Sequence, residues 1–216
     1  NINGISNPSD CAKEFARHFS SVCSRSDLED DSKRRYERLL AEKVYDISLF
    51  DFGYRNALKV FDGMSQTLST DPDGICFKHI VHGPKRLIVL FGLLFRAIIT
   101  HGYCPMLWRD GIQLPLVKNR LGDICSLDNY RDITISSFGS KFFEAFVFFH
   151  FSDVFATDPL QFGYKAKSGA DMAFFTFYEA IAHFVKQNTP VYCCLLDVKK
   201  AFNSVQHYTL LCCLID

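Results

Sequence analysis

A short apolar run that ends in one carboxylate constrains this chain more than any other feature. The run, Val191–Leu196, has the length and composition of a buried strand, and Asp197 follows it directly. Asn203 and Ser204, both good helix-capping residues, come a few positions later. A strand-to-helix turn fixes a carboxylate while leaving it open to solvent, an arrangement that suits metal-dependent phosphoryl chemistry. Asp197 is therefore a candidate metal ligand; the alternative is an ordinary aspartate that caps the next helix or pairs with a nearby lysine.

The composition predicts a folded intracellular protein with an aromatic core. Hydrophobic residues make up 48% of the 216 residues and charged residues 22%, which argues against a disordered chain. The 22 phenylalanines predict a thick aromatic core. Lysine plus arginine and aspartate plus glutamate both number 24, so any basic surface for a nucleic acid must be local. The nine cysteines show no CxxC spacing, and we expect reduced, buried thiols rather than a zinc site.

Hydrophobic periodicity predicts a helical first half and a mixed α+β second half. The expected helices cover 9–23, 34–44, 51–63, 84–101, 138–151 and 170–186, and a last one presents Val205, Tyr208, Cys212 and Ile215 on one face. A charged linker is expected at 24–33 and a turn at Asp71–Gly74. Two apolar faces are expected to point inward. One is the aromatic stripe Phe138, Phe142, Phe146 and Phe149, and the other, on the next helix, is Ala170, Phe174, Phe177, Ile181 and either Phe184 or Val185.

Three cations gather on a predicted β-hairpin. Its strands are expected at Gly111–Val117 and Tyr130–Ile135. Lys118 and Arg120 lie in the connecting loop, and Arg131 lies on the returning strand. Such a hairpin is suited to hold a phosphate group. The alternative is three ordinary surface cations.

Five short blocks follow one another in a fixed order between residues 71 and 205. They are Asp71–Ile75; Gly102–Pro105 with Trp108 and Leu114–Lys118; Asp128–Ile133 continuing to Lys141 and Glu144; Gln161–Tyr164; and Leu196–Phe202. In this order the blocks resemble the reverse transcriptases of non-LTR (LINE-type) retrotransposons. The resemblance implies a helical lead-in over 1–105. It implies a partial reverse transcriptase domain over 106–216, with the fingers and the beginning of the palm of a right-hand polymerase.

The resemblance implies RNA-directed DNA polymerase activity, with dNTPs, an RNA template and a DNA primer as partners. Asp197 matches the first catalytic aspartate of the palm, and the Val198 backbone carbonyl faces the metal beside it. The implied cofactor is Mg²⁺, with Mn²⁺ as a substitute. Two such ions stabilise the attacking and leaving oxygens of phosphoryl transfer, and both prefer hard oxygen ligands.

The resemblance also assigns nucleotide contacts to Lys118, Arg131 and Phe202. The two cations match positions that hold the incoming triphosphate. Phe202 matches the ring under the sugar, which leaves no room for a 2′-hydroxyl; the alternative is a plain core phenylalanine. Weaker template or primer contacts are assigned to Arg120, Gln161 and Lys165.

Positions that depart from the family pattern include three at or next to the assigned site residues. Asp132 stands where the family has proline and adds a negative charge next to Arg131. Asn203 replaces an aspartate that is not the main metal ligand, and Lys165 replaces an arginine, which removes bidentate phosphate contact. The change to Asp132 bears most directly on the triphosphate contact, because Arg131 is its neighbour in sequence.

The family's YxDD-type motif, which supplies the other catalytic carboxylates, does not occur in these residues. We therefore expect a truncated fragment that is inactive without the rest of the polymerase chain. No membrane partner is expected, since the apolar stretch Leu87–Thr100 is too short to span a bilayer. Two alternatives remain: a non-catalytic relic that binds RNA weakly at most, and an unrelated α+β enzyme.

Overall fold

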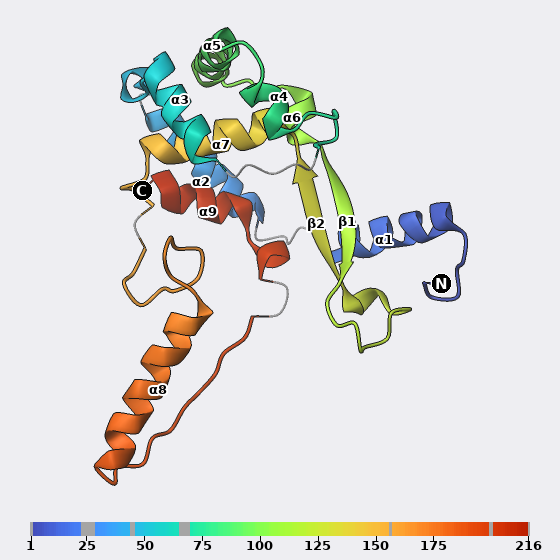
Figure 1. Cartoon of the computed structure of the whole chain (residues 1–216), viewed down its shortest axis with the longest axis vertical. Coiled ribbons are helices and arrows are strands. Elements are labelled where there is room, and N and C mark those ends of the chain that lie inside the picture. Colours follow the sequence, from blue (N-terminus) through green and yellow to red (C-terminus); the bar gives the residue numbers. More distant parts are fainter. Residues whose placement is uncertain are drawn as a thin grey trace. The chain divides into compact units, whose positions relative to one another are not determined.

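The computed structural model in Figure 1 describes residues 2–22, 29–43, 46–64, 70–155, 157–198 and 201–215. The chain divides into two units, which are described separately below. The first contains residues 1–150 and 200–216, and the second contains residues 151–199. Helices and one two-stranded antiparallel sheet make up the regular structure of the described residues, which confirms the α+β class at this level.

An aromatic core holds the helices of the first unit together. It is built by α3 (Tyr54–Gly63), α4 (Phe77–Val81), α5 (Arg86–His101) and α7 (Phe138–His150), with α6 (Met106–Arg109) against α7. Phe95, Phe142 and Phe146 are fully buried, and the Phe95 ring meets Phe142 edge-on and Phe146 at a tilt. The predicted aromatic core is thus confirmed. The core contains residues from both sides of residue 105. The domain boundary predicted between residues 105 and 106 stays a prediction.

A second helix pair joins distant parts of the first unit. Helix α2 (Glu29–Glu42) packs along α9 (His207–Ile215), where Ser32 and Thr209 share a hydrogen bond of 2.9 Å. The linker predicted at 24–33 is wrong for residues 29–33, which are helical. An ion pair one turn apart, Arg34 with Asp31, supports the helix there. Residues 24–28 lie outside the described residues.

The predicted helix at 84–101 begins later and ends where expected. Lys85 caps α5, which begins at Arg86, so Pro84 precedes the helix instead of lying in its first turn. Gly102 follows the last turn with φ of 60°, a left-handed conformation that glycine adopts without a steric penalty.

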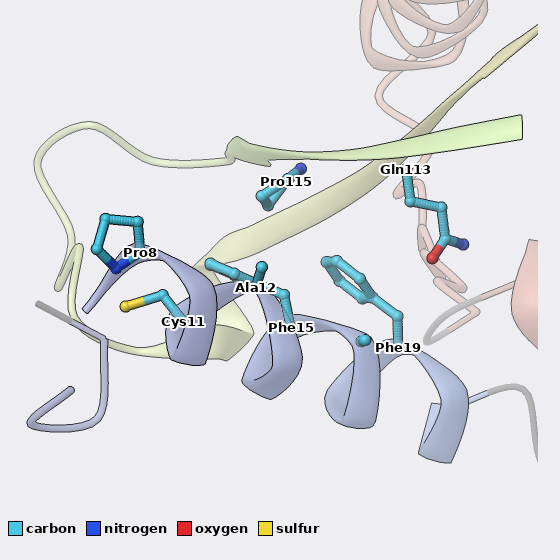
Figure 2. Close-up of a pocket in the computed structure, with 8 residues that line it drawn as sticks. Pro8, Cys11, Ala12, Phe15, Phe19, Gln113 and Pro115 are labelled. Atoms are coloured by element: carbon cyan, nitrogen blue, oxygen red, sulfur yellow. The ribbon is translucent and has the colours of Figure 1, made fainter. Parts of the chain in front are cut away.

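The predicted hairpin is confirmed. Strand β1 (Gly111–Val117) pairs with β2 (Tyr130–Ser136), and Leu116 lies opposite Arg131. Helix α1 (Pro8–Val22) lies against one face of this hairpin, and the Phe15 ring meets Tyr130 edge-on at 4.8 Å. Figure 2 shows β1 side chains extending toward α1 across a shallow apolar groove.

The second unit contains α8 (Ala170–Lys186) and an extended segment that follows it. Asn188, with φ of 55°, ends the helix: its N–H bonds the Val185 carbonyl, and the Thr189 N–H bonds the Phe184 carbonyl. The helix bounds match the prediction. The predicted burial does not, because no residue of α8 is buried in the structure and Phe174 is 70% exposed.

The buried strand predicted at Val191–Leu196 is wrong. The segment has no regular secondary structure, and Leu195 and Leu196 are 88% and 92% exposed. Among the described residues, no backbone hydrogen bond joins it to another strand. An apolar run becomes a buried strand only where a partner supplies ladder hydrogen bonds and cover.

The cysteines of the described residues are free thiols, but most are not buried. Cys76 and Cys212 are buried, while Cys125, Cys193, Cys194 and Cys213 are exposed. The prediction of buried thiols is therefore wrong for these four. In the described part of the chain, no helix is long and apolar enough to cross a membrane.

Candidate functional site

The hairpin register brings Lys118 and Arg131 to one face. Leu116 lies opposite Arg131, and residues paired across an antiparallel ladder point to the same side of the sheet. The Lys118 N–H donates to the Asn129 carbonyl at 2.7 Å, which continues the register by one pair beyond the strand. Lys118 lies two residues after Leu116, so it shares the face of Arg131, at a diagonal separation of roughly 7–8 Å.

The opposite face of the hairpin carries Asp132. Asp132 pairs with Pro115 across the hairpin. Pro115 and Gln113, both on β1, face α1 (Figure 2). The negative charge that follows Arg131 in sequence therefore points to the other side of the sheet. The interference expected from this departure is weaker in the fold than the sequence indicates.

The cations of the hairpin have no carboxylate partner among the described residues. The Lys118 Nζ donates to the Asp128 backbone carbonyl at 2.8 Å, a neutral acceptor. Neither Arg120 nor Arg131 forms an ion pair with a described residue. All three side chains are exposed, so their charge is available to an anionic ligand.

Asp197 and Val198 lie in the second unit, in the exposed segment after α8. The strand expected to fix them is missing from the described structure. The Asp197 carboxylate and the Val198 carbonyl are the oxygen donors that Mg²⁺ prefers, and such sites are commonly completed by water and substrate phosphates. Among the described residues, no group of three His, Cys, Asp or Glu side chains is gathered for a metal. That these donors hold a metal ion stays a prediction.

Phe202 is not a core phenylalanine. It begins the 3-10 helix η3 (Phe202–Ser204) of the first unit and is 71% exposed. The plain core alternative is therefore wrong, and a contact of the ring with a sugar stays a prediction.

The three predicted template or primer residues are exposed polar groups. Arg120 lies in the loop of the hairpin. Gln161 donates from Nε2 to the Gly163 carbonyl at 3.2 Å, and Lys165 donates from Nζ to the Asp158 carbonyl at 3.3 Å. The last two bonds stabilise a local turn, and a contact with nucleic acid stays a prediction for all three.

A structural contact of Asp71 was missed by the sequence reasoning. The Asp71 carboxylate accepts the Ile75 N–H within its own turn at 2.7 Å, and also the N–H of Phe138, the first residue of α7, at 2.7 Å. Aspartate at the start of such a turn is a recognisable signal. Its second contact, 67 residues away, depends on the fold and left no local signal.

Neither a model of a known protein family nor a curated protein matches this chain. The resemblance to reverse transcriptases therefore depends on the five blocks and on the chemistry of the residues within them.

Proposed function

We propose that this chain is the first part of a reverse transcriptase domain of a non-LTR retrotransposon, acting inside the cell on dNTPs, an RNA template and a DNA primer. The observation that carries the proposal is the hairpin face. Lys118 and Arg131 share it without a carboxylate partner among the described residues, and Asp132, which follows Arg131 in sequence, points to the other face. A triphosphate is the anion that best uses two such cations.

Each site residue has a distinct role in this proposal. Lys118 and Arg131 bind the triphosphate and neutralise the charge that develops on the leaving pyrophosphate. Phe202 packs under the sugar and selects deoxynucleotides. Asp197 and the Val198 carbonyl hold Mg²⁺ or Mn²⁺, which supplies charge stabilisation to the attacking and leaving oxygens.

These residues supply one of the carboxylates that two-metal chemistry needs. Alone, the chain is therefore expected to bind nucleotide without extending a primer. Primer extension with Mg²⁺, dNTPs and a primed RNA template measures this, and template-dependent products would contradict it.

Triphosphate binding by the 216-residue chain tests the proposal. Lys118→Ala and Arg131→Ala should each weaken dATP binding by about tenfold, because each removes a charge-assisted contact. Arg55→Ala on α3, an exposed cation away from the hairpin, is the matched control and should bind as the unmodified chain does. Equal affinities for all four proteins would overturn the proposal.

One observation favours a second candidate, a non-catalytic chain that binds RNA weakly. Asp197 lies in an exposed segment without strand partners among the described residues, so no sheet fixes its carboxylate. This candidate predicts an RNA affinity that falls as the salt concentration rises, and no measurable affinity for dATP. It also predicts that Asp197→Asn leaves the RNA affinity unchanged.

A further inference from the structure

The Asn129 side chain joins the two arms of the hairpin loop. Its Oδ1 accepts the Asn119 N–H at 3.0 Å, and its Nδ2 donates to the Asn119 carbonyl at 2.9 Å. The same Nδ2 reaches the Asp123 carbonyl at 3.1 Å. The amide thus satisfies both backbone groups of Asn119, as the backbone of a neighbouring strand would.

The backbone of Asn129 holds the preceding position of the opposite arm. Its carbonyl accepts the Lys118 N–H at 2.7 Å, so consecutive residues of that arm are fixed by one asparagine. The Lys118 Nζ bonds the carbonyl of the neighbouring Asp128. Lys118 therefore starts from a fixed backbone, and only its flexible stem has to be ordered when a ligand binds.

We infer that Asn129 is a positioning residue that presents Lys118 to the triphosphate. The inference depends on the proposed function and adds a residue to the same site. In the bound state a phosphate oxygen replaces the Asp128 carbonyl as acceptor of the Lys118 Nζ, while the backbone of Lys118 stays in place. Fixing this backbone beforehand lowers the entropy lost on binding.

The chemistry of the side chain explains why an asparagine suits this position. A primary amide offers an acceptor and two donors, and all of the bonds made here use that combination. An aspartate keeps the acceptor for the Asn119 N–H but loses both donors. It also adds a negative charge near a site for an anion.

The matched control lies next in sequence. The Tyr130 hydroxyl donates to the Ile124 carbonyl at 2.8 Å, so it stabilises the far part of the same loop. Tyr130→Phe removes that bond and leaves the bonds of Lys118 and Asn119 intact.

The experiment combines dATP affinity with amide hydrogen exchange read by NMR on the 216-residue chain. Asn129→Ala should weaken dATP binding by about threefold to tenfold and speed exchange of the Asn119 amide, since these hydrogen bonds are lost. Asn129→Asp should weaken binding while keeping much of the protection of that amide. Tyr130→Phe should bind dATP as the unmodified chain does.

A double-mutant cycle separates positioning from general support of the hairpin. In a Lys118→Ala background, Asn129→Ala should cause no further loss of affinity. A full additional loss in that background would show that Asn129 acts through the whole loop, and would overturn the inference. If Asn129→Ala does not fold, as judged by its circular dichroism melt, Asn129→Ser, a small and uncharged replacement, carries the cycle.

The two proposals fail in different ways. If Lys118→Ala weakens dATP binding and neither Asn129 variant does, the positioning role is wrong and the proposed function stands. If Lys118→Ala binds dATP as well as the unmodified chain, both are wrong.

Discussion

At the scale of single residues, the Asp71 carboxylate joins its own turn to a helix 67 residues away. It accepts backbone N–H groups from Asp73 and Ile75 in its turn and from Phe138 at the start of α7. A negative charge at a helix N-terminus is also favoured by the helix dipole. Asp71 therefore ties the turn before α4 to the beginning of α7.

Replacing this carboxylate should destabilise the first unit. Asp71→Ala should lower the free energy of unfolding by about 2 kcal/mol, since hydrogen bonds to a charged, half-buried group are lost. Asp73→Ala, in the same turn but exposed, is the control and should change it by less than about 0.5 kcal/mol. Urea unfolding monitored by circular dichroism measures both, and equal effects would contradict the role given to Asp71.

Residue-level prediction from the sequence succeeded where chemistry is local. Lys118, Arg120 and Arg131 were identified because their charges stand near a turn, and the structure leaves them exposed. The bonds of Asn129 and the second contact of Asp71 were missed, because asparagine and aspartate in loops look alike whether they cap a turn or join distant segments.

At the scale of elements, prediction succeeded for segments that carry their own hydrogen bonds or pair with a neighbour. The bounds of α8 and β1 match, since helices close their bonds internally and the hairpin pairs strands that are close in sequence. Val191–Leu196 was predicted wrongly because a strand, unlike a helix, makes its backbone hydrogen bonds with another segment. A strand in that position depends on partners outside its own neighbourhood, and periodicity does not reveal whether they are present.

Amide hydrogen exchange should distinguish these two kinds of segment. Amides of Val191–Val198 should exchange at nearly the rate of an unstructured peptide, because among the described residues they make no backbone hydrogen bonds. Amides in the second half of α7, around the buried Phe146, should be strongly protected. Mass spectrometry of peptides from both segments measures this, and strong protection at Val191–Val198 would mean that the segment is paired in solution.

At the scale of the whole molecule, the second unit exposes far more apolar surface than a stable isolated unit usually does. Phe174 on α8 and Leu195 and Leu196 after it are at least 70% exposed. The run Val191–Leu196 also has the composition of an aggregation-prone strand. The chain alone is therefore expected to self-associate.

Charges placed in that run should reduce the association. Leu195→Asp combined with Leu196→Asp should lower the associated fraction several-fold, because charged side chains resist burial between chains. Leu121→Asp is the matched control, since Leu121 is 98% exposed at the hairpin tip and lies outside that run. Sedimentation velocity over a range of concentrations measures the fraction, and an unchanged fraction in the double variant would contradict this role of the run.

The α+β class and the aromatic core of the first unit could be predicted, since composition and periodicity report both. The assignment of Asp197 and the hairpin to different units could not be predicted, because the order of sequence blocks does not reveal which blocks pack together.

The most direct test of the central claim is paramagnetic NMR with Mn²⁺ and dATP. The proposal requires that Lys118 and Arg131 hold a metal-bound triphosphate and that Asp197 holds a metal ion. Mn²⁺ should then broaden the amide signals of Val198, Lys118 and Arg131 together. Asp197→Asn should abolish the broadening at Val198, whereas the control Asp171→Asn, an exposed acid of α8, should not. Broadening that leaves out either Val198 or the hairpin, or that persists at Val198 in Asp197→Asn, would contradict the account.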